Sequence, residues 1–503
     1  AAVLAPFAAV AAAAQQPAAP AGGLTLDAVV QATLRTNPGV EIARLQVDGA
    51  RGLLLGAGGV FDPRFTSSLT GKRSTAPALD AAGLVSAAAS PVTNTGAYGL
   101  GGAWMLRSGI TLLPEVTVSR SEVMGVSPAP AGGGSVKLGM SVPLLRDRFG
   151  RLSASGERAA RAALDAQSLS VGHATATGLL TAVSAYWAYR GAQERLEVYR
   201  DSEQRAGRLL EETRALVRAD ERPAGDLNQL MANLSAKRVT RIAAEQAVVV
   251  ARRDLGLAMG AEPEEVMALP PAADGFPAPV RFDPDTAALR AMVHAALERR
   301  ADLAAAGRQT RSAEAVVQGT RSGLKPRLDL NVTAGYAGLA TGQGFGSFVE
   351  PLYRNVPGLS ATVALQYELP VANTAARGQA LQSTATLQEQ RVSERDLARR
   401  VASGVVVAAE ALRRSALSLA EADEEVRLYA TTLENERRKS QLGVSTLLDV
   451  LTAADGLTGA MLNVVSSRQS YAVSIATLRW ETGTLAAAGP DGPALAGSLS
   501  TPP

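Results

Sequence analysis

A long internal duplication is the feature that most constrains this chain. Residues 34–63 (LRTNPGVEIARLQVDGARGLLLGAGGVFDP) recur as residues 297–326 (LERRADLAAAGRQTRSAEAVVQGTRSGLKP), and both ends are offset by 263 positions. Each copy leads into alternating, strand-like segments, then a Val-Pro or Leu-Pro step, then a long stretch with a helical pattern. Length alone would suggest about three domains, but the duplication favours two halves of one elongated body.

Composition excludes several classes of function. The 503 residues include 50 basic and 47 acidic side chains, a balance that gives no reason to expect nucleic acid as a partner. There is no cysteine, which excludes disulfides, thiolate catalysis and Cys-based zinc sites. The two histidines, His173 and His294, lack the spacing of a metal pair, and no phosphate-binding glycine loop or nucleophile motif is present. We therefore expect a protein that is not an enzyme, with no catalytic residue, metal or cofactor.

Three segments differ in composition from the two halves. Residues 1–23 combine an apolar run (AAVLAPFAAVAAAA) with QQPAAPAGG, which we interpret as a signal remnant and flexible N-terminal segment; a disordered Ala/Pro-rich tail is the alternative. The Pro-rich residues 261–285 are predicted to be a linker between the halves. The Gly/Ala/Pro-rich residues 486–503 are predicted to be a flexible tail.

Long stretches without proline predict long helices. No proline occurs between Pro143 and Pro223, or between Pro370 and Pro490. A helix of about 65 residues is about 100 Å long and needs partner helices along its length. A seam of nine apolar positions averages 3.5 residues per step, the period of a left-handed coiled coil; its members are Val405, Ala408, Leu412, Ala416, Leu419, Ala422, Val426, Tyr429 and Leu433.

Each long helical stretch is predicted to break and fold back as an antiparallel hairpin. The first break is expected at Arg218–Asp226, where Pro223 and Gly225 interrupt the helix, and the second at Leu442–Thr446, with Gly443 at the turn. The first repeat, 24–260, then contains a leading helix, strand hairpins at about 64–145 and a helical hairpin at about 148–260. The second repeat, 286–485, contains a leading helix, a strand hairpin at about 326–370 and a helical hairpin at about 376–484. The expected helices are 148–218 returning as 226–259, and 376–440 returning as 445–484.

The strand-like segments alternate with period two. Val136, Leu138 and Met140 share one face, for example, whereas Lys137 and Gly139 share the other. Both a half-buried sheet of a soluble protein and a membrane barrel, apolar outside and polar inside, give this pattern, and the aromatic enrichment of these segments favours the barrel. The first half carries 36 extra residues here, including a hairpin predicted at residues 107–109. That hairpin is expected either to form part of a barrel or to decorate its outside.

Five local motifs, in this order along the chain, carry a resemblance to a known family. They are LTLDAVVQATLRTNPGV (24–40), SVPLLRDRFGR (141–151), ALERRADLAAA (296–306), LKPRLDL (324–330) and GVSTLLDVLTA (443–453). With the duplication and the paired hairpins, the chain resembles the TolC-like outer-membrane efflux proteins, or outer-membrane factors, from Leu24 to Leu485. The resemblance implies an α+β membrane protein: a trimeric transmembrane β-barrel continued by a long antiparallel α-helical coiled-coil barrel, with two internal repeats per chain. Three copies of a two-hairpin unit would give a barrel of 12 strands.

The resemblance also implies location, partners and function. Family members lie in the outer membrane of Gram-negative bacteria and extend into the periplasm. They conduct substrate passively, as the exit duct of a tripartite efflux or type I secretion system. The implied partners are two further copies in a homotrimer, a periplasmic adaptor (membrane fusion) protein, an inner-membrane pump of RND, ABC or MFS type, and outer-membrane lipid. The alternative is a periplasmic adaptor or coiled-coil scaffold protein of such a system.

By the same resemblance, a periplasmic gate is expected at the tips of the helical hairpins. Asp449 falls where the family carries an acidic residue at the constriction, so that three copies would form a cation-favouring ring. The alternative is a solvated charge near a helix start, where the helix dipole favours Asp. The expected gate and selectivity residues are Asp449, Thr452, Asp226 and Ser445.

Two departures from the family affect the other tip residues. Thr452 replaces a second carboxylate and Ser445 replaces an arginine, so we expect a substitute for the family's ionic lock. The candidates for this network are Arg218, Asp220, Glu221, Arg222, Arg438 and Lys439. The expected adaptor-docking tips contain Pro223, Gly225, Leu442, Gly443 and Val444.

Overall fold

The computed structural model describes most of the chain as two compact units. It describes residues 23–79, 83, 85–86, 91–124, 130–221, 223–342, 344–354, 358–489, 492–495 and 501. Unit 1 comprises Ala1–Ile42, Gly172–Arg300 and Arg400–Pro503, and unit 2 comprises Ala43–Val171 and Ala301–Arg399. The expected signal remnant lies outside the described residues, except for Gly23.

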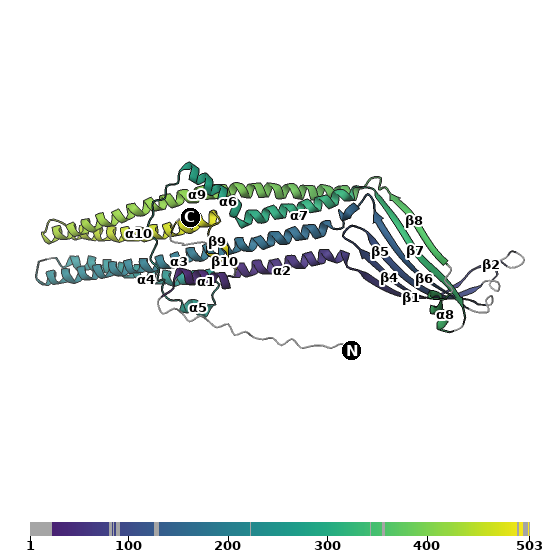
Figure 1. Cartoon of the computed structure of the whole chain (residues 1–503). Coiled ribbons are helices and arrows are strands. Elements are labelled where there is room, and N and C mark those ends of the chain that lie inside the picture. The colour runs from purple at the N-terminus through teal and green to yellow at the C-terminus, as the bar shows by residue number, and fades with distance from the viewer. Residues whose placement is uncertain are drawn as a thin grey trace. The chain divides into compact units, whose positions relative to one another are not determined.

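Unit 2 contains a six-stranded antiparallel sheet (Figure 1). The strands in spatial order are β1 (Arg64–Thr75), β4 (Val92–Met105), β5 (Thr111–Met124), β6 (Ala131–Pro143), β7 (Arg327–Thr341) and β8 (Gly358–Glu368). A separate two-stranded pair joins β2 (Ala78–Leu79) and β3 (Val85–Ser86). The first half of the chain therefore contributes four strands to the large sheet, and the second half contributes two.

The strand register gives the sheet one apolar face and one polar face. One row across the strands pairs Leu100, Val116, Val136, Tyr336 and Leu359 in turn. The neighbouring row is polar or small, because side chains one residue apart point to opposite faces; it consists of Thr66, Gly101, Glu115, Lys137, Gly335 and Ser360. The alternation predicted from the sequence is confirmed in β4 to β8, whereas in β1 the apolar row ends on Ser67, opposite Leu100, with Phe65 and Leu69 on the same face.

The predicted turn at residues 107–109 joins β4 to β5 and is confirmed. Leu106 and Ile110 close it by a backbone hydrogen bond, and Gly109 adopts a φ of +84°. The turn packs on the loop before the next helix, where a Cβ on Gly150 would lie 1.9 Å from the Arg107 carbonyl oxygen. Arg107 also donates to Glu157 at 2.8 and 3.0 Å and lies over the Phe61 ring.

The helices of unit 2 pack through small and polar residues. The long ones are α2 (Pro38–Gly58), α7 (Ala301–Gly323) and the first parts of α3 (Ser155–Arg218) and α9 (Thr374–Gln441), and a short helix, α8 (Gly346–Val349), lies between β7 and β8. Ser312 on α7 donates to the carbonyl of Ala159 on α3 at 2.8 Å, and Thr320 on α7 bonds Ser383 on α9 at 2.8 Å. Such residues let helix backbones approach closely. The sequence placed the start of α3 near residue 148; residues 148–150 instead form a short 3₁₀ turn, with Asp147 and Phe149 at positive φ.

Unit 1 consists mainly of helices around an apolar core. They are α1 (Leu26–Thr36), α4 (Gly225–Met259), α5 (Pro263–Ala268), α6 (Thr286–Arg299), α10 (Leu447–Glu481) and the remaining parts of α3 and α9. Leu24 forms a parallel bridge with Ala272 in the linker, and the Tyr186 hydroxyl bonds both Leu24 and Asp274. The pKa of Tyr186 is raised, chiefly because burial disfavours the phenolate. The linker is thus attached to the start of α1.

The predicted coiled-coil seam on α9 is confirmed. Val405, Leu412 and Leu419 are almost completely buried, and Ala408, Ala422 and Leu433 are also buried. Ala416 and Val426 pack at the edge of the core, whereas Tyr429 is 37% exposed. Tyr429 still contacts α10, because a Cβ on Gly456 would lie 2.3 Å from its ring.

Two further segments complete unit 1. Within the C-terminal segment expected to be flexible, β9 (Ala486–Gly489) pairs with β10 (Gly492–Leu495). Among the described helices, α10 is long and apolar enough to cross a membrane, but 44% of its most apolar window is buried within the protein. The core helix of a soluble protein has the same character.

Candidate functional site

The turn between α9 and α10, the second tip, is a Schellman motif followed by a capping box. Gly443 adopts a φ of +75°, its N–H bonds the Ser440 carbonyl, and the Val444 N–H bonds the Lys439 carbonyl. The two apolar side chains of this turn are exposed, Leu442 by 78% and Val444 by 77%. The predicted turn at Gly443 is confirmed, and it presents apolar side chains to solvent.

Asp449 caps the start of α10. Its Oδ2 accepts hydrogen bonds from the N–H and the hydroxyl of Thr446 at 2.9 and 2.6 Å, and from the Ser445 hydroxyl at 3.2 Å. The Asp449 N–H donates in return to the Thr446 Oγ1 at 3.3 Å, which completes the capping box. In the single chain, Asp449 therefore has the helix-start role given as the alternative above.

A second carboxylate and one lysine extend this network. The Ser445 hydroxyl lies 2.6 Å from the Glu436 carboxylate, whose other oxygen accepts from Lys439 at 2.7 Å. Hydrogen bonds from Thr446 lower the pKa of Asp449, and those from Lys439 and Ser445 lower the pKa of Glu436. Two carboxylates thus stay ionised at the second tip, with Lys439 as a nearby positive charge.

The turn between α3 and α4, the first tip, uses the same motif with a different residue. Asp220, with a φ of +64°, occupies the left-handed position, and the Glu221 N–H bonds the Leu216 carbonyl. Asp tolerates this conformation better than most residues. Pro223 and Gly225 were predicted to interrupt the helix. The break predicted at Arg218–Asp226 is confirmed, since α3 ends at Arg218 and α4 begins at Gly225, but the left-handed residue that turns the chain is Asp220.

The remaining predicted residues are dispersed over the two tips. Arg438 pairs with Glu434 one turn away at 2.8 Å, and Arg218 donates to the Arg214 carbonyl at 3.4 Å. Asp226 is half-buried in the first turn of α4, and the Thr452 hydroxyl donates to the Leu448 carbonyl at 2.8 Å. Arg222 lies outside the described residues. Among the described residues, Lys439 is the network candidate that joins the Asp449 cluster.

The two hairpins are held together by residues that the sequence analysis did not select. Lys237 on α4 donates to Asp455 on α10 at 2.5 Å; their side chains are 18% and 51% exposed. Arg205 on α3 donates to the Thr458 hydroxyl on α10 at 3.2 Å. We call these two contacts the inter-hairpin latch. Leu447 and Leu451 pack beside it, against leucines of α3 and α4.

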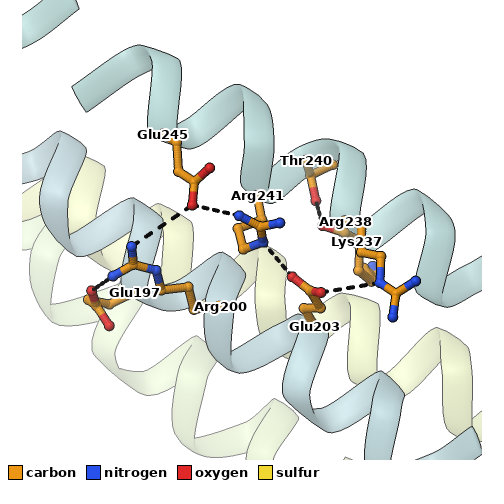
Figure 2. A network of polar contacts seen from close by, with 8 residues as sticks. All are labelled: Glu197, Arg200, Glu203, Lys237, Arg238, Thr240, Arg241 and Glu245. Carbon is orange, nitrogen blue, oxygen red and sulfur yellow. Dashed lines mark hydrogen bonds and ion pairs between the residues drawn. The ribbon is translucent and has the colours of Figure 1, made fainter. Parts of the chain in front are cut away.

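A ladder of alternating charges joins α3 to α4 within the first hairpin (Figure 2). Glu203 accepts from Arg241 at 2.6 Å and from Arg238 at 3.4 Å. Arg241 also contacts Glu245 at 2.5 Å, and Arg200 approaches the same carboxylate at 3.9 Å. Long-range pairing of this kind has no signal in sequence spacing, which also explains why Lys237 and Asp455, 218 residues apart, were missed.

The described residues contain no group of three or more His, Asp or Glu side chains placed to hold a metal ion. The two tips carry charged side chains and helix caps, and the latch links their hairpins.

Comparison with known proteins identifies the fold, and a family match over part of the chain. Residues 292–484 match the family "Outer membrane efflux protein". The CmeC outer membrane channel of Campylobacter jejuni superposes with a TM-score of 0.66 at 16% identity, over 91% of this chain and 85% of that one. VceC of Vibrio cholerae superposes with a TM-score of 0.65 at 15% identity, over 91% and 96% of the two chains.

A third solved structure is the open state of the MtrE channel of Neisseria gonorrhoeae, with a TM-score of 0.61 at 17% identity over 91% and 88% of the chains. No curated protein sequence matches the chain significantly. The family and these neighbours are channel proteins rather than enzymes. The chain therefore has the fold of outer-membrane efflux channels of known structure, and its residues 292–484 match the outer membrane efflux protein family.

Proposed function

We propose that this efflux channel is the exit duct of a tripartite efflux or type I secretion system. It would receive substrate from an inner-membrane pump of RND, ABC or MFS type through a periplasmic adaptor, and conduct it passively. The exposed apolar side chains of Leu442 and Val444 support an adaptor-docking role for the second tip, because exposed apolar groups at a turn are candidates for partner contacts.

Two internal repeats underlie the proposed architecture. The breaks between α1 and α2 and between α6 and α7 fall at Asn37 and Arg300, and β1 and β7 begin at Arg64 and Arg327. Both pairs are 263 residues apart, the offset of the sequence duplication. We infer that the two halves of the chain form structurally equivalent segments of the channel wall.

The two-faced sheet is the observation that carries the membrane part of the proposal. An apolar face opposite a Ser-, Thr- and Gly-rich face suits a wall between lipid and a water-filled lumen. A sheet with free edges cannot rest in lipid, where unpaired backbone groups cost several kcal/mol each. Three copies would close the barrel, with the helices continuing it as a tunnel.

The latch and the Asp449 cluster support a gate at the tips. In a trimer, three copies of Asp449 and Glu436 would surround the axis as a ring of ionised carboxylates, which favours cations. Opening would draw the second hairpin away from the first and so break the contact between Lys237 and Asp455. The exposed side of α10 near the tip, at Leu448, Asp449 and Thr452, would then line the enlarged aperture.

The test is assembly and conductance of the full chain. Purified in detergent, the protein should have about three times the chain mass of 51.8 kDa by light scattering, and should form ion-conducting pores in planar bilayers. A monomer that is fully soluble without detergent would refute the channel and favour the alternative, a periplasmic adaptor or coiled-coil scaffold.

A further inference from the structure

We propose that all six strands of this chain form the barrel wall, so that three copies close an 18-stranded barrel by pairing β1 of one copy with β8 of the next. The proposal rests on the trimer proposed above. It assigns to each sheet edge one occupant, a second copy of this chain.

The extra hairpin, β4–β5, has the position of a wall element. It is inserted between β1 and β6, and its strands are 14 residues each, as long as those of β6 and β7. Its apolar face continues the apolar face of the neighbours: Tyr98, Leu100 and Trp104 lie on it and remain 40–45% exposed. A decoration on the outside would leave β1 paired with β6 and would have no need of a lipid-compatible face.

The turn of this hairpin is built into the helical end of unit 2. Arg107 bonds Glu157 in the first turn of α3, and Gly150 admits the Arg107 carbonyl at a distance that excludes any Cβ. The hairpin is therefore fixed at the same end of the sheet as the junctions between strands and helices.

The two edges of the sheet are complementary. Because six is an even number, the two edge strands run in opposite directions, and β8 can pair antiparallel with β1 of a neighbouring copy. The strands match in length, with 12 residues in β1 and 11 in β8, and nearly every residue of both is exposed. Each edge carries backbone N–H and C=O groups that the membrane interior cannot satisfy.

The register also gives the strand tilt of a closed barrel. The row that starts at Thr66, two residues into β1, meets β7 at Gly335, eight residues into that strand. A shift of six residues over four strand steps, at about 3.3 Å per residue and about 4.8 Å per strand, corresponds to a tilt of about 45°. This value lies at the upper end of the range for membrane barrels, about 35–45°.

Strand number sets the width of the exit. At a tilt of 40–45°, an 18-stranded barrel measures about 36–39 Å between opposite backbones, whereas a 12-stranded barrel measures about 24–26 Å. The ratio of about 1.5 does not depend on the tilt. The cross-section of the exit would therefore be more than doubled.

Cryo-electron microscopy of the full-length protein in lipid nanodiscs tests this directly by counting strands. Eighteen strands around a threefold axis are expected. Twelve strands, with β4–β5 outside the wall, would overturn the inference but leave the trimeric channel intact. A particle that is not a trimer, or that does not insert into the nanodisc, would overturn both.

Disulfide trapping tests the seam between copies, and the cysteine-free chain needs no background substitutions. Ser68→Cys in β1 is combined in turn with Thr362→Cys, Ala364→Cys or Gln366→Cys in β8, residues that share one face of the sheet. At least one pair should give dimer and trimer bands on oxidation, because adjacent strands bring Cα atoms to about 4.5–5.5 Å. The control pairs Ser68→Cys with Thr117→Cys in β5, which should give none. The seam would be refuted if none of the three pairs gave dimer and trimer bands, or if only the control pair gave them.

Discussion

The contact between Lys237 and Asp455 gives the sharpest prediction about gating. Lys237→Ala removes an ion pair that joins α4 to α10, and so weakens the attachment of the second hairpin to the first. The variant should open more readily than the wild type. Asp455→Ala should have the same effect, and the exchanged pair, Lys237→Asp with Asp455→Lys, should restore closure.

The size of the effect follows from the burial of the pair. Half of the Asp455 side chain is exposed, so solvent screens the interaction, and a pair of this kind contributes about 0.2–1 kcal/mol. If three copies open together, the closed state loses about 0.6–3 kcal/mol, which corresponds to an increase of about 3- to 150-fold in the ratio of open to closed channels. At 1 M salt, where the Debye length is about 3 Å, the wild type should approach the variant.

Open probability in planar bilayers measures this ratio. The matched control is Arg241→Ala, which breaks contacts of similar length inside the first hairpin and should leave open probability unchanged. The reasoning fails if Lys237→Ala and Arg241→Ala behave alike, or if the exchanged pair remains open.

Three further variants test other parts of the structure. Asp449→Asn should reduce cation selectivity in bilayers and thermal stability at pH 7. The folded pKa of Asp449 is lowered, so the carboxylate stabilises the fold fully above the unfolded pKa of about 3.9, and this stabilisation is lost as the pH falls through the folded pKa. The melting temperatures of wild type and variant should therefore converge in acid. Cation selectivity that is unchanged at pH 7 would contradict the proposed ring of carboxylates. Gly150→Ala should cost at least about 1–2 kcal/mol, because Gly150 has a φ of +64° and no room for a Cβ beside Arg107; an unaltered melting temperature would contradict this. Arg300→Ala should cost about 3 kcal/mol in chemical denaturation, because it removes an ion pair with Glu481 in which both side chains are less than 20% exposed, and a cation-π contact with Trp480. A loss under about 1 kcal/mol would contradict this.

Periodicity made most of the fold predictable. The spacing of residues such as Leu412 and Leu419 identified the buried side of α9, and the alternation of residues such as Val136 and Leu138 identified the faces of the sheet. Together with the local motifs, these patterns led to the α+β channel fold and to the family. Both patterns are periods in the spacing of apolar residues, about 3.5 in the helices and two in the strands, and such periods can be read from a single sequence.

Pairing between distant segments was not predictable in the same way. The sequence indicated a hairpin near residues 107–109 but not its partners, because strand order depends on which edges meet in space. Similarly, Asp449 was recognised by its position in a motif, whereas its contact with Thr446 and the pairing of Lys237 with Asp455 depend on side-chain geometry. The role predicted for Gly225 at the first tip differs for a related reason. Glycine allows a helix to end, but here Asp220 is the residue that adopts the left-handed conformation.

The pairing of β6 with β7 has a consequence for how the sheet is made. Its partners, from Ala131 with Thr341 to Pro143 with Asp329, are between 186 and 210 residues apart in the chain. Strands β1, β4, β5 and β6 come from one segment of the chain, whereas β7 follows in sequence only after the first helical hairpin and the linker. During that interval β6 is a free edge, and closing so long a loop is slow. At this stage β6 could pair with the β7 of another molecule, so we expect mispairing between chains to begin at this edge.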